Sequence, residues 1–194
     1  MRTVALVTAM DRPLGRSAGN AVEVAESVEV LAGGGPADVV ELTLALAREM
    51  LAGAGRSDVD PADALADGRA MDVWRRMIAA QGGDPDAALP RPRETHVVTA
   101  PASGTLTRLD ALALGVAAWR LGAGRARKED AVSAAAGVVW TAGVGEQVTA
   151  GQPLIELHTD DADRIPRALE ALEGSIGVDT EDELLPLVVD RIGA

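Results

Sequence analysis

The first part of the chain combines one short apolar run with stretches of helical periodicity. Residues 3–7 are apolar and partly β-branched, which predicts a buried strand over 3–9. Apolar residues then recur at helical spacing, which predicts helices from about 19 or 20 to 32, over 39–51, and from 60 to 78. Glycines after each stretch indicate where these helices end. A strand followed by helices indicates the α/β class for this part of the chain.

Beyond residue 83 the pattern changes to short apolar runs that are separated by glycine turns. Residues 84–93 contain three prolines and are predicted to be a linker. The remainder shows two helical stretches (109–121 and 160–172), five strand-like runs (95–99, 104–107, 137–141, 147–148 and 153–158) and a mixed tail over 179–192. Short strands around a helix are typical of a small α+β module with a folded-over sheet. We therefore predict two domains, an α/β part over 1–88 and an α+β part over 89–194.

Composition narrows the possible partners. The 194 residues include no Phe, Tyr or Cys, so a core must be built from aliphatic side chains and three tryptophans, and thiolate metal sites and disulfides are excluded. The net charge is −12, which argues against nucleic acid and an anionic membrane surface as partners. The chain has no apolar run long enough for a membrane span and no signal-peptide pattern at its start, so we expect a cytoplasmic protein.

The loop over residues 10–20, between the first strand and the first helix, is the strongest candidate for a ligand site, because α/β proteins place ligands at such positions. Backbone N–H groups at a helix start could bind an anion, although the spacing is that of neither a dinucleotide fingerprint nor a P-loop. Alternatively, loop carbonyls could bind a hard cation together with Glu23 or Glu26 from the helix. An ordinary tight turn followed by solvated glutamates explains the same pattern.

Other candidate residues have simpler structural explanations. His96 and His158 lie at strand edges with no motif that links them to a nucleophile or a metal. The acidic run 160–163 is typical of a helix start, and the charged run 125–130 is typical of a solvated turn. Ser103 lacks the preceding glycine of a nucleophile elbow, so we reject that role for it.

Residues 142–154 have the glycine spacing of a biotinyl or lipoyl domain. Such domains carry their cofactor on a lysine at a hairpin tip. Lys128 is the single lysine of the chain, and it lies well before this hairpin. A carrier function is therefore not predicted, although a similar barrel-like fold is expected.

Several stretches together resemble one known family. Residues 10–24 strongly resemble the corresponding loop and helix of the pyrimidine-nucleoside (thymidine) phosphorylases. Residues 121–130 and 145–158 resemble the C-terminal domain of that family, and residues 77–82 also fit. The matching pieces keep their order along nearly the whole chain, but family members are roughly twice as long. The resemblance is therefore to the C-terminal portion, with part of the α/β domain followed by a small barrel-sandwich-like (hammerhead) domain.

The resemblance implies a pentosyltransferase reaction. Phosphate, the co-substrate, would attack the anomeric carbon of a pyrimidine (deoxy)nucleoside to give the base and a sugar 1-phosphate, and the complete enzyme would be a homodimer. In the family, the phosphate-binding segment and the residues that grip the pyrimidine lie upstream of the part that this sequence matches. No catalytic or substrate-binding residue can therefore be carried over, and we expect the isolated chain to be inactive.

A monovalent cation site can be carried over from the resemblance, usually assigned as potassium. By motif, its ligands fall on the carbonyls of Leu14 and Ser17 and on the carboxylate of Glu26, and further ligands come from the upstream segment.

Two hypotheses remain open at this point. The chain is either the C-terminal portion of a phosphorylase, or a non-catalytic binding or assembly module that retains its fold. In both cases we expect the strand over 3–9 to lack its neighbours in a sheet, which would leave an open edge. Self-association or poor order over residues 1–60 would follow, with residues 95–194 better ordered.

Overall fold

The chain forms two compact units in the computed structural model, which describes residues 3–181 and 184–193. The first unit comprises the described residues of Met1–Ala9, Glu26–Ala88 and Leu185–Ala194, and the second those of Met10–Ala25 and Leu89–Leu184. The boundary between residues 88 and 89 coincides with the predicted one, but two segments belong to the other unit than predicted: residues 10–25 to the second, and the described residues of 185–194 to the first. Each of these segments contains a strand that pairs with a strand from the other half of the sequence. The domain assignment 1–88 and 89–194 itself stays a prediction.

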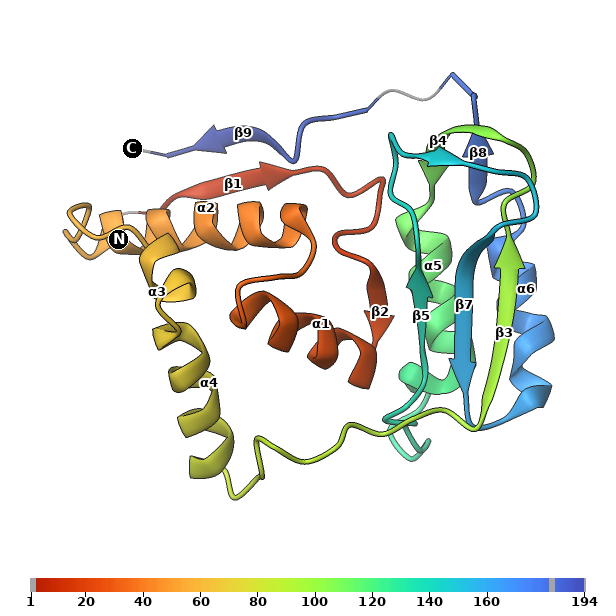
Figure 1. Cartoon of the computed structure of the whole chain (residues 1–194), viewed down its shortest axis with the longest axis horizontal. Coiled ribbons are helices and arrows are strands. Elements are labelled where there is room, and N and C mark those ends of the chain that lie inside the picture. The colour runs from red at the N-terminus through yellow and green to blue at the C-terminus, as the bar shows by residue number, and fades with distance from the viewer. Residues whose placement is uncertain (1–2, 182–183, 194) are drawn as a thin grey trace. The chain divides into compact units, whose positions relative to one another are not determined.

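Strand β1 (Ala5–Thr8) of the first unit pairs antiparallel with β9 (Val188–Ile192), with Ala5 opposite Ile192 and Leu6 opposite Arg191 (Figure 1). The expectation that the first strand lacks its neighbours is therefore wrong in part, since the chain supplies one. The residue pattern over 179–192 did not predict β9. Most of this strand is exposed, so its residues do not alternate between apolar and polar.

Helices make up the rest of the first unit. They are α2 (Ala37–Gly53), α3 (Ala62–Ala66) and α4 (Arg69–Ala80), and α1 (Ala21–Leu31) continues into this unit from the second. The single helix predicted over 60–78 is wrong, since it is interrupted between α3 and α4. Gly68 there has a φ of 83°, a left-handed conformation that cannot continue a right-handed helix.

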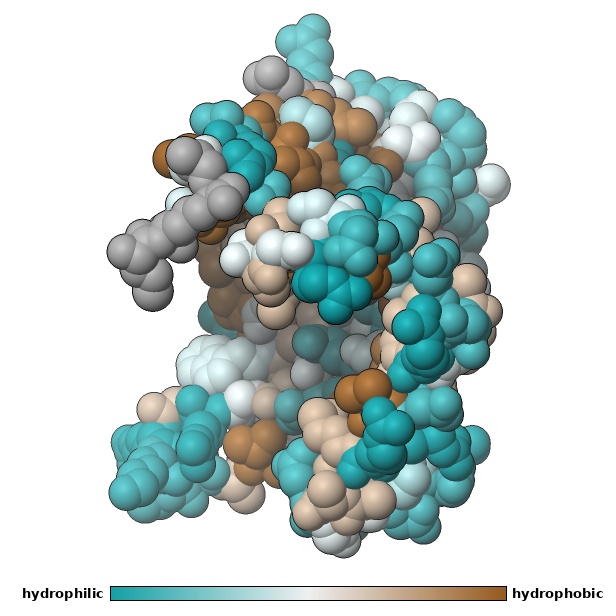
Figure 2. All heavy atoms as spheres, turned by 90° about the vertical axis from the view of Figure 1, so that its left-hand side faces the viewer, coloured by the Kyte–Doolittle hydropathy of each residue, from teal (hydrophilic) through white to brown (hydrophobic). Residues whose placement is uncertain are grey.

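One ion pair joins β9 to α2 within this unit. The Arg191 guanidinium donates two bonds to the Glu49 carboxylate, at 2.6 and 2.9 Å, and these bonds raise the pKa of Arg191 above its ordinary value. The opposite face of the two-stranded ribbon carries Val7 and Ile192, which are exposed. Figure 2 shows apolar areas on the surface of this unit among hydrophilic ones.

Two small antiparallel sheets and two helices form the second unit. The larger sheet has the order β2-β5-β7-β3, with β2 at Ser17–Gly19, β5 at Gly137–Trp140, β7 at Pro153–Thr159 and β3 at Glu94–Thr99. The smaller sheet has the order β6-β4-β8, with β6 at Gln147–Val148, β4 at Gly104–Leu109 and β8 at Ile176–Val178. Helices α5 (Ala111–Ala118) and α6 (Ile165–Leu172) pack side by side on one face of the larger sheet (Figure 1).

The core of the second unit lies between α5, α6 and the sheets. Leu114 and Ala117 of α5 contribute to it, together with Val138 of β5 and Leu157 of β7, all of them at most 1% exposed. Small side chains along α5 allow the helix to lie close to the sheet. The predicted mixture of helices and short strands is confirmed, whereas a hammerhead arrangement stays a prediction.

Several element boundaries differ from the predictions. The helix predicted over 109–121 is α5 followed by a π-helical turn at Trp119–Ala123, and that predicted over 160–172 begins with a 3-10 turn at Ala162–Arg164 before α6. Strands β2 and β8 were not predicted, because each is short and contains a glycine, a residue that is depleted in strands. Within the described residues, none of the helices combines the length and apolarity that a membrane crossing requires.

Candidate functional site

The loop before α1 is fixed to β5 by backbone hydrogen bonds. The N–H of Trp140 donates to the carbonyl of Arg16 at 3.0 Å, and the N–H of Asn20 donates to the carbonyl of Ala136 at 3.3 Å. Bonded and non-bonded residues alternate along an antiparallel strand, so the carbonyl of Ser17 points away from β5. Because β2 is an edge strand of its sheet, this carbonyl is directed outward and can act as a ligand.

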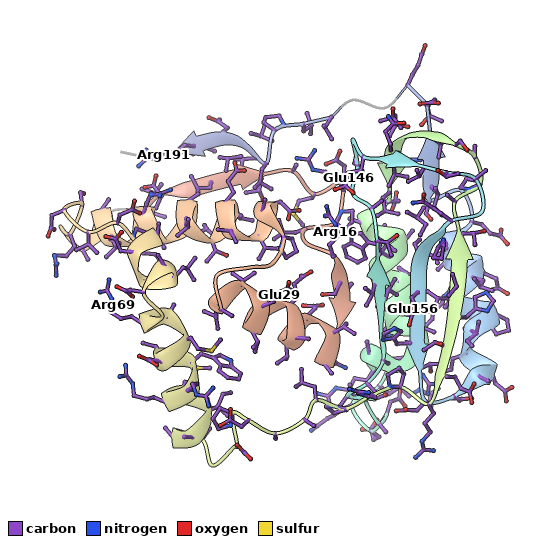
Figure 3. All side chains as sticks on the ribbon, viewed as in Figure 1. Arg16, Glu29, Arg69, Glu146, Glu156 and Arg191 are labelled. Carbon is purple, nitrogen blue, oxygen red and sulfur yellow. The ribbon has the colours of Figure 1, made fainter. Side chains whose placement is uncertain are left out.

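Arg16 holds the loop from the other side. Its guanidinium donates to the carboxylate of Glu146 at 2.8 Å, and both side chains are partly exposed (Figure 3). A second bond, at 2.9 Å, goes to the carbonyl of Gly15. Gly143 makes room for the guanidinium, since a Cβ atom there would lie 2.8 Å from Arg16 Nη2. The carbonyl of Gly15 is thus already used inside the loop, which leaves its neighbours as candidate ligands.

Glycine is required where β2 approaches β5. Gly19 has a φ of 148°, and a Cβ atom at this position would lie 2.6 Å from the carbonyl oxygen of Ala136. The N–H of Gly19 donates to the carboxylate of Glu23 at 2.6 Å. Glu23 is one of the two helix glutamates that could bind a cation. Its carboxylate instead accepts a hydrogen bond from the backbone at the start of the helix.

Asn20 immediately precedes α1, a position from which an asparagine side chain often caps the first turn of a helix. Its side-chain amide donates instead to the carbonyls of Ala123 and Ser133, at 2.9 and 2.8 Å. These bonds tie the start of α1 to a loop more than a hundred residues away in the sequence. Sequence periodicity gave no signal for this contact, because neither carbonyl belongs to a recognisable motif.

The three predicted cation ligands are divided between the two units. Leu14 is exposed in the loop, and Ser17 follows in β2, with a buried hydroxyl that has no hydrogen-bond partner in the part of the chain that the structure describes. Glu26 is half-buried on α1. Leu14 and Ser17 belong to the second unit and Glu26 to the first, so the common site stays a prediction. Over residues 3–181 and 184–193, no group of three or more His, Asp or Glu side chains is placed to hold a metal ion.

The other candidates have the structural roles that the sequence favours. His158 Nε2 lies 2.8 Å from Glu156 Oε1 on the same strand. The carboxylate of Asp161 accepts a bond from the N–H of Asp163 and so caps the 3-10 turn, as expected of an acidic helix start. Ser103 accepts a hydrogen bond from a backbone N–H in a turn, which is not the setting of a nucleophile.

The charged run over 125–130 is exposed, as predicted for a solvated turn. Arg125 and Asp130 within it also line a cavity of about 590 Å³, which sequence reasoning missed. The opposite part of its lining comes from a distant segment, residues 161–167, so no local pattern could have indicated it.

Comparison with known proteins connects this chain to enzymes of nucleoside metabolism. Residues 105–179 match the family described as "Pyrimidine nucleoside phosphorylase C-terminal domain". A thymidine phosphorylase of Mycobacterium tuberculosis is 53% identical over 191 residues, which are 98% of this chain and 45% of that protein. Pyrimidine-nucleoside phosphorylases of Staphylococcus epidermidis and Staphylococcus aureus are 33% and 32% identical over 201 residues, which are 98% of this chain and 46% of each protein.

The chain spans less than half the length of these relatives. The family match covers β4 to β8, which is the greater part of the second unit, and the longer alignments extend over the loop and helices before it. The chain belongs to the pyrimidine-nucleoside and thymidine phosphorylase family, and the part of the family that it matches is the C-terminal portion.

Proposed function

We propose that this chain serves as the C-terminal portion of a pyrimidine-nucleoside phosphorylase, with thymidine as a candidate substrate. In that reaction phosphate attacks the anomeric carbon of a pyrimidine (deoxy)nucleoside, the bond to the base breaks, and a sugar 1-phosphate forms. The observation that carries the proposal is 53% identity over 98% of the chain with a protein named thymidine phosphorylase. The complete enzyme is proposed to be a homodimer.

The groups that stabilise the departing base and orient phosphate are proposed to lie in the part of the family that this chain does not match. That assignment is supported by the share of the relatives covered, 45% and 46%. It is also supported by Arg16 of the candidate loop and Glu23 of α1, whose charged side chains are bonded to the protein itself. The role of this chain is then architectural: it supplies one side of a site.

Reconstitution tests the proposal. The 194-residue chain is assayed for phosphate-dependent release of thymine from thymidine and of uracil from uridine. The assay is repeated after mixing with the remaining part of the Mycobacterium tuberculosis relative. We expect no release above the blank from the chain alone and measurable release from the mixture. Release of base by the pure chain would contradict the proposal that the catalytic groups lie outside it. A mixture that associates stably but remains inactive would favour a non-catalytic assembly module instead.

A monovalent cation site is proposed at the carbonyls of Leu14 and Ser17 and the carboxylate of Glu26. Support comes from the outward direction of the Ser17 carbonyl and from the commitment of Glu23 elsewhere. An all-oxygen set of two carbonyls and one carboxylate suits a hard cation such as K⁺. When bound, the ion would fix the loop against the helix.

The cation proposal is tested on the reconstituted enzyme by its thermal midpoint in KCl against choline chloride at equal ionic strength. We expect K⁺ to raise the midpoint, and Glu26→Gln to abolish that rise. Glu29→Gln is the matched control, because Glu29 is an exposed carboxylate one helical turn further along α1 (Figure 3). Equal loss in both variants, or no K⁺ effect in the parent, would contradict the site.

A further inference from the structure

The cavity beside the π-helical turn, here named the arginine cavity, lies entirely in the second unit. Its volume is about 590 Å³, within the range of small-molecule sites. Three segments form its walls: the turn after α5, the loop over residues 124–131, and the start of α6. Four arginines line it: Arg120, Arg125, Arg164 and Arg167.

Two of these arginines are used by the protein itself. Arg120 donates to the backbone carbonyl of Arg167 and lies 3.5 Å from the carboxylate of Glu170. Arg164 pairs with Asp161 at 3.4 Å. These contacts hold two guanidinium groups in the wall, where their charge is partly offset by Glu170 and Asp161.

The other two arginines have bonding capacity to spare. The guanidinium of Arg125 makes one bond, at 3.3 Å, to the backbone carbonyl of Lys128. The side chain of Arg167 makes no hydrogen bond or ion pair with any of the residues that the structure describes. A guanidinium offers five donors in a planar fork that matches carboxylate and phosphate oxygens. Among the residues that the structure describes, no carboxylate pairs with Arg125 or Arg167, although the net charge of the chain is −12.

Acidic residues also line the cavity, and most are committed. The carboxylate of Asp161 pairs with Arg164 and caps the 3-10 turn, and that of Asp130 accepts the backbone N–H of Arg127 at 2.8 Å. The remaining acid is Asp163, which is exposed. The cavity wall therefore offers more unpaired positive charge than unpaired negative charge. The carboxylate of Asp163 would repel an anion.

An aromatic surface completes the cavity. Trp119 is 43% exposed and lines it. Gly124 lets the following loop lie against the edge of the indole, since a Cβ atom there would be 2.8 Å from Trp119 Cδ1. An exposed indole beside guanidinium groups provides a stacking surface for a flat ring.

We propose that the arginine cavity binds a small ligand in which a flat ring carries an oxyanion, such as a mononucleotide or an aromatic carboxylate. The oxyanion is held by Arg125 and Arg167, and the ring stacks on Trp119. This inference does not rest on the proposed phosphorolysis, because the cavity is contained in the chain and its occupancy is measured without catalysis.

Calorimetric titration of the 194-residue chain tests the proposal with four probes: uridine 5′-monophosphate, orotate, uridine and inorganic phosphate. Either of the first two is expected to bind at least about tenfold more tightly than uridine and phosphate, the equivalent of about 1.4 kcal/mol. The tighter of the two identifies the source of the oxyanion, phosphate or carboxylate. If neither exceeds the two half-ligands, the proposal is overturned.

Substitutions localise the binding. Arg125→Gln and Arg167→Gln are each expected to weaken the tighter probe about tenfold, since each removes a charge-assisted bond. Arg91→Gln is the matched control, because Arg91 is exposed, lies in the same unit and does not line the cavity. Equal weakening by all three would show a general charge effect and overturn the site. The thermal midpoint of each variant confirms that folding is unchanged.

Two further variants separate the contacts. Trp119→Leu is expected to weaken the ring-bearing probe several-fold while leaving inorganic phosphate unaffected. Asp163→Asn is expected to tighten the anionic probes, because it removes a carboxylate that lines the cavity and repels an anion. A Trp119→Leu variant that binds like the parent would remove the ring from the proposal.

Discussion

The second unit buries a continuous apolar cluster that extends from Ala100 to Leu172, whereas helices α2, α3 and α4 of the first unit contain no buried residue. Both units have well-formed helices, so the presence of a helix in this chain does not require a buried core beside it. Periodic apolar residues suffice for the helices, but a core needs two faces that cover each other. In the first unit large apolar side chains such as Met50 and Val73 remain exposed.

The difference predicts where the chain derives its stability. Apolar burial supplies most of the free energy of folding, so the second unit should be the more stable. The first unit relies on a two-stranded ribbon and on exposed ion pairs such as Arg191–Glu49. Such ribbons and pairs are weak stabilisers in water.

Core truncation should have the largest effect. Leu157 in β7 is fully buried, and Leu157→Ala is expected to lower the free energy of unfolding by about 2–5 kcal/mol, because it removes packed atoms and leaves a cavity. Leu46→Ala in α2 is the matched control, since Leu46 is 46% exposed and its loss should cost less than about 0.5 kcal/mol. Urea unfolding measures both. Equal losses of unfolding free energy in the two variants would show that the first unit has a core as stabilising as that of the second.

Amide hydrogen exchange should reveal an intermediate effect. After correction for intrinsic rates, amides of β1 are expected to exchange at least about tenfold faster than those of β5 and β7, because β1 has one pairing strand and little burial.

The exposed apolar face of the ribbon should also promote self-association, measured by sedimentation over a range of concentrations. A monodisperse monomer in which β1 is as protected as β5 would remove the contrast between the units.

The smallest effect concerns pH and the first unit alone. The backbone N–H of Ala62, and then the guanidinium of Arg48, hold the pKa of Asp60 below its ordinary value of 3.8. A carboxyl whose folded pKa is lowered stabilises the fold above its unfolded pKa, and this contribution is lost as the pH falls through the folded value. The carboxyl resonance of Asp60 should therefore titrate below 3.8. Arg48→Gln should raise that pKa only in part, because the bond from Ala62 remains.

Titration of Asp60 at or above its ordinary value would contradict the contacts at the start of α3. Thermal unfolding of Asp60→Asn provides the second measurement, since the difference from the parent should shrink as the medium is acidified through the titration. Arg191 contributes in the opposite sense: its raised pKa stabilises the fold below the unfolded value and loses effect only in strong alkali. The stabilisation from Arg191 is therefore fully present near neutral pH and should not vary with pH there.

Much of the secondary structure follows from local pattern. The strand at 5–8, the helices at 21–31 and 37–53, and the strands at 94–99 and 153–159 lie within a few residues of their predicted bounds. Their signals are long enough to show a period or are bounded by glycine and proline. By contrast, β2 and β8 have three residues each, and the break at Gly68 is a single backbone angle inside a continuous helical pattern.

The candidate loop shows the same division. Its position between a strand and a helix and the resemblance of residues 10–24 to the phosphorylases are properties of the sequence. The local sequence pattern does not distinguish between Glu23 and Glu26 as the carboxylate ligand of a cation. The bond from the Gly19 N–H to Glu23, and the edge position that turns the Ser17 carbonyl outward, appear only when the chain is folded.

The sequence by itself determined the family, the helices and strands with clear periods, the absence of cysteine and the net charge of −12. These are local properties, since each depends on neighbours in the chain. Tertiary structure alone decided the pairing of β1 with β9, the attachment of Asn20 to Ala123 and Ser133, and the arginine cavity. Each of these joins residues far apart in sequence, and such contacts form only where burial and backbone bonding bring distant segments together.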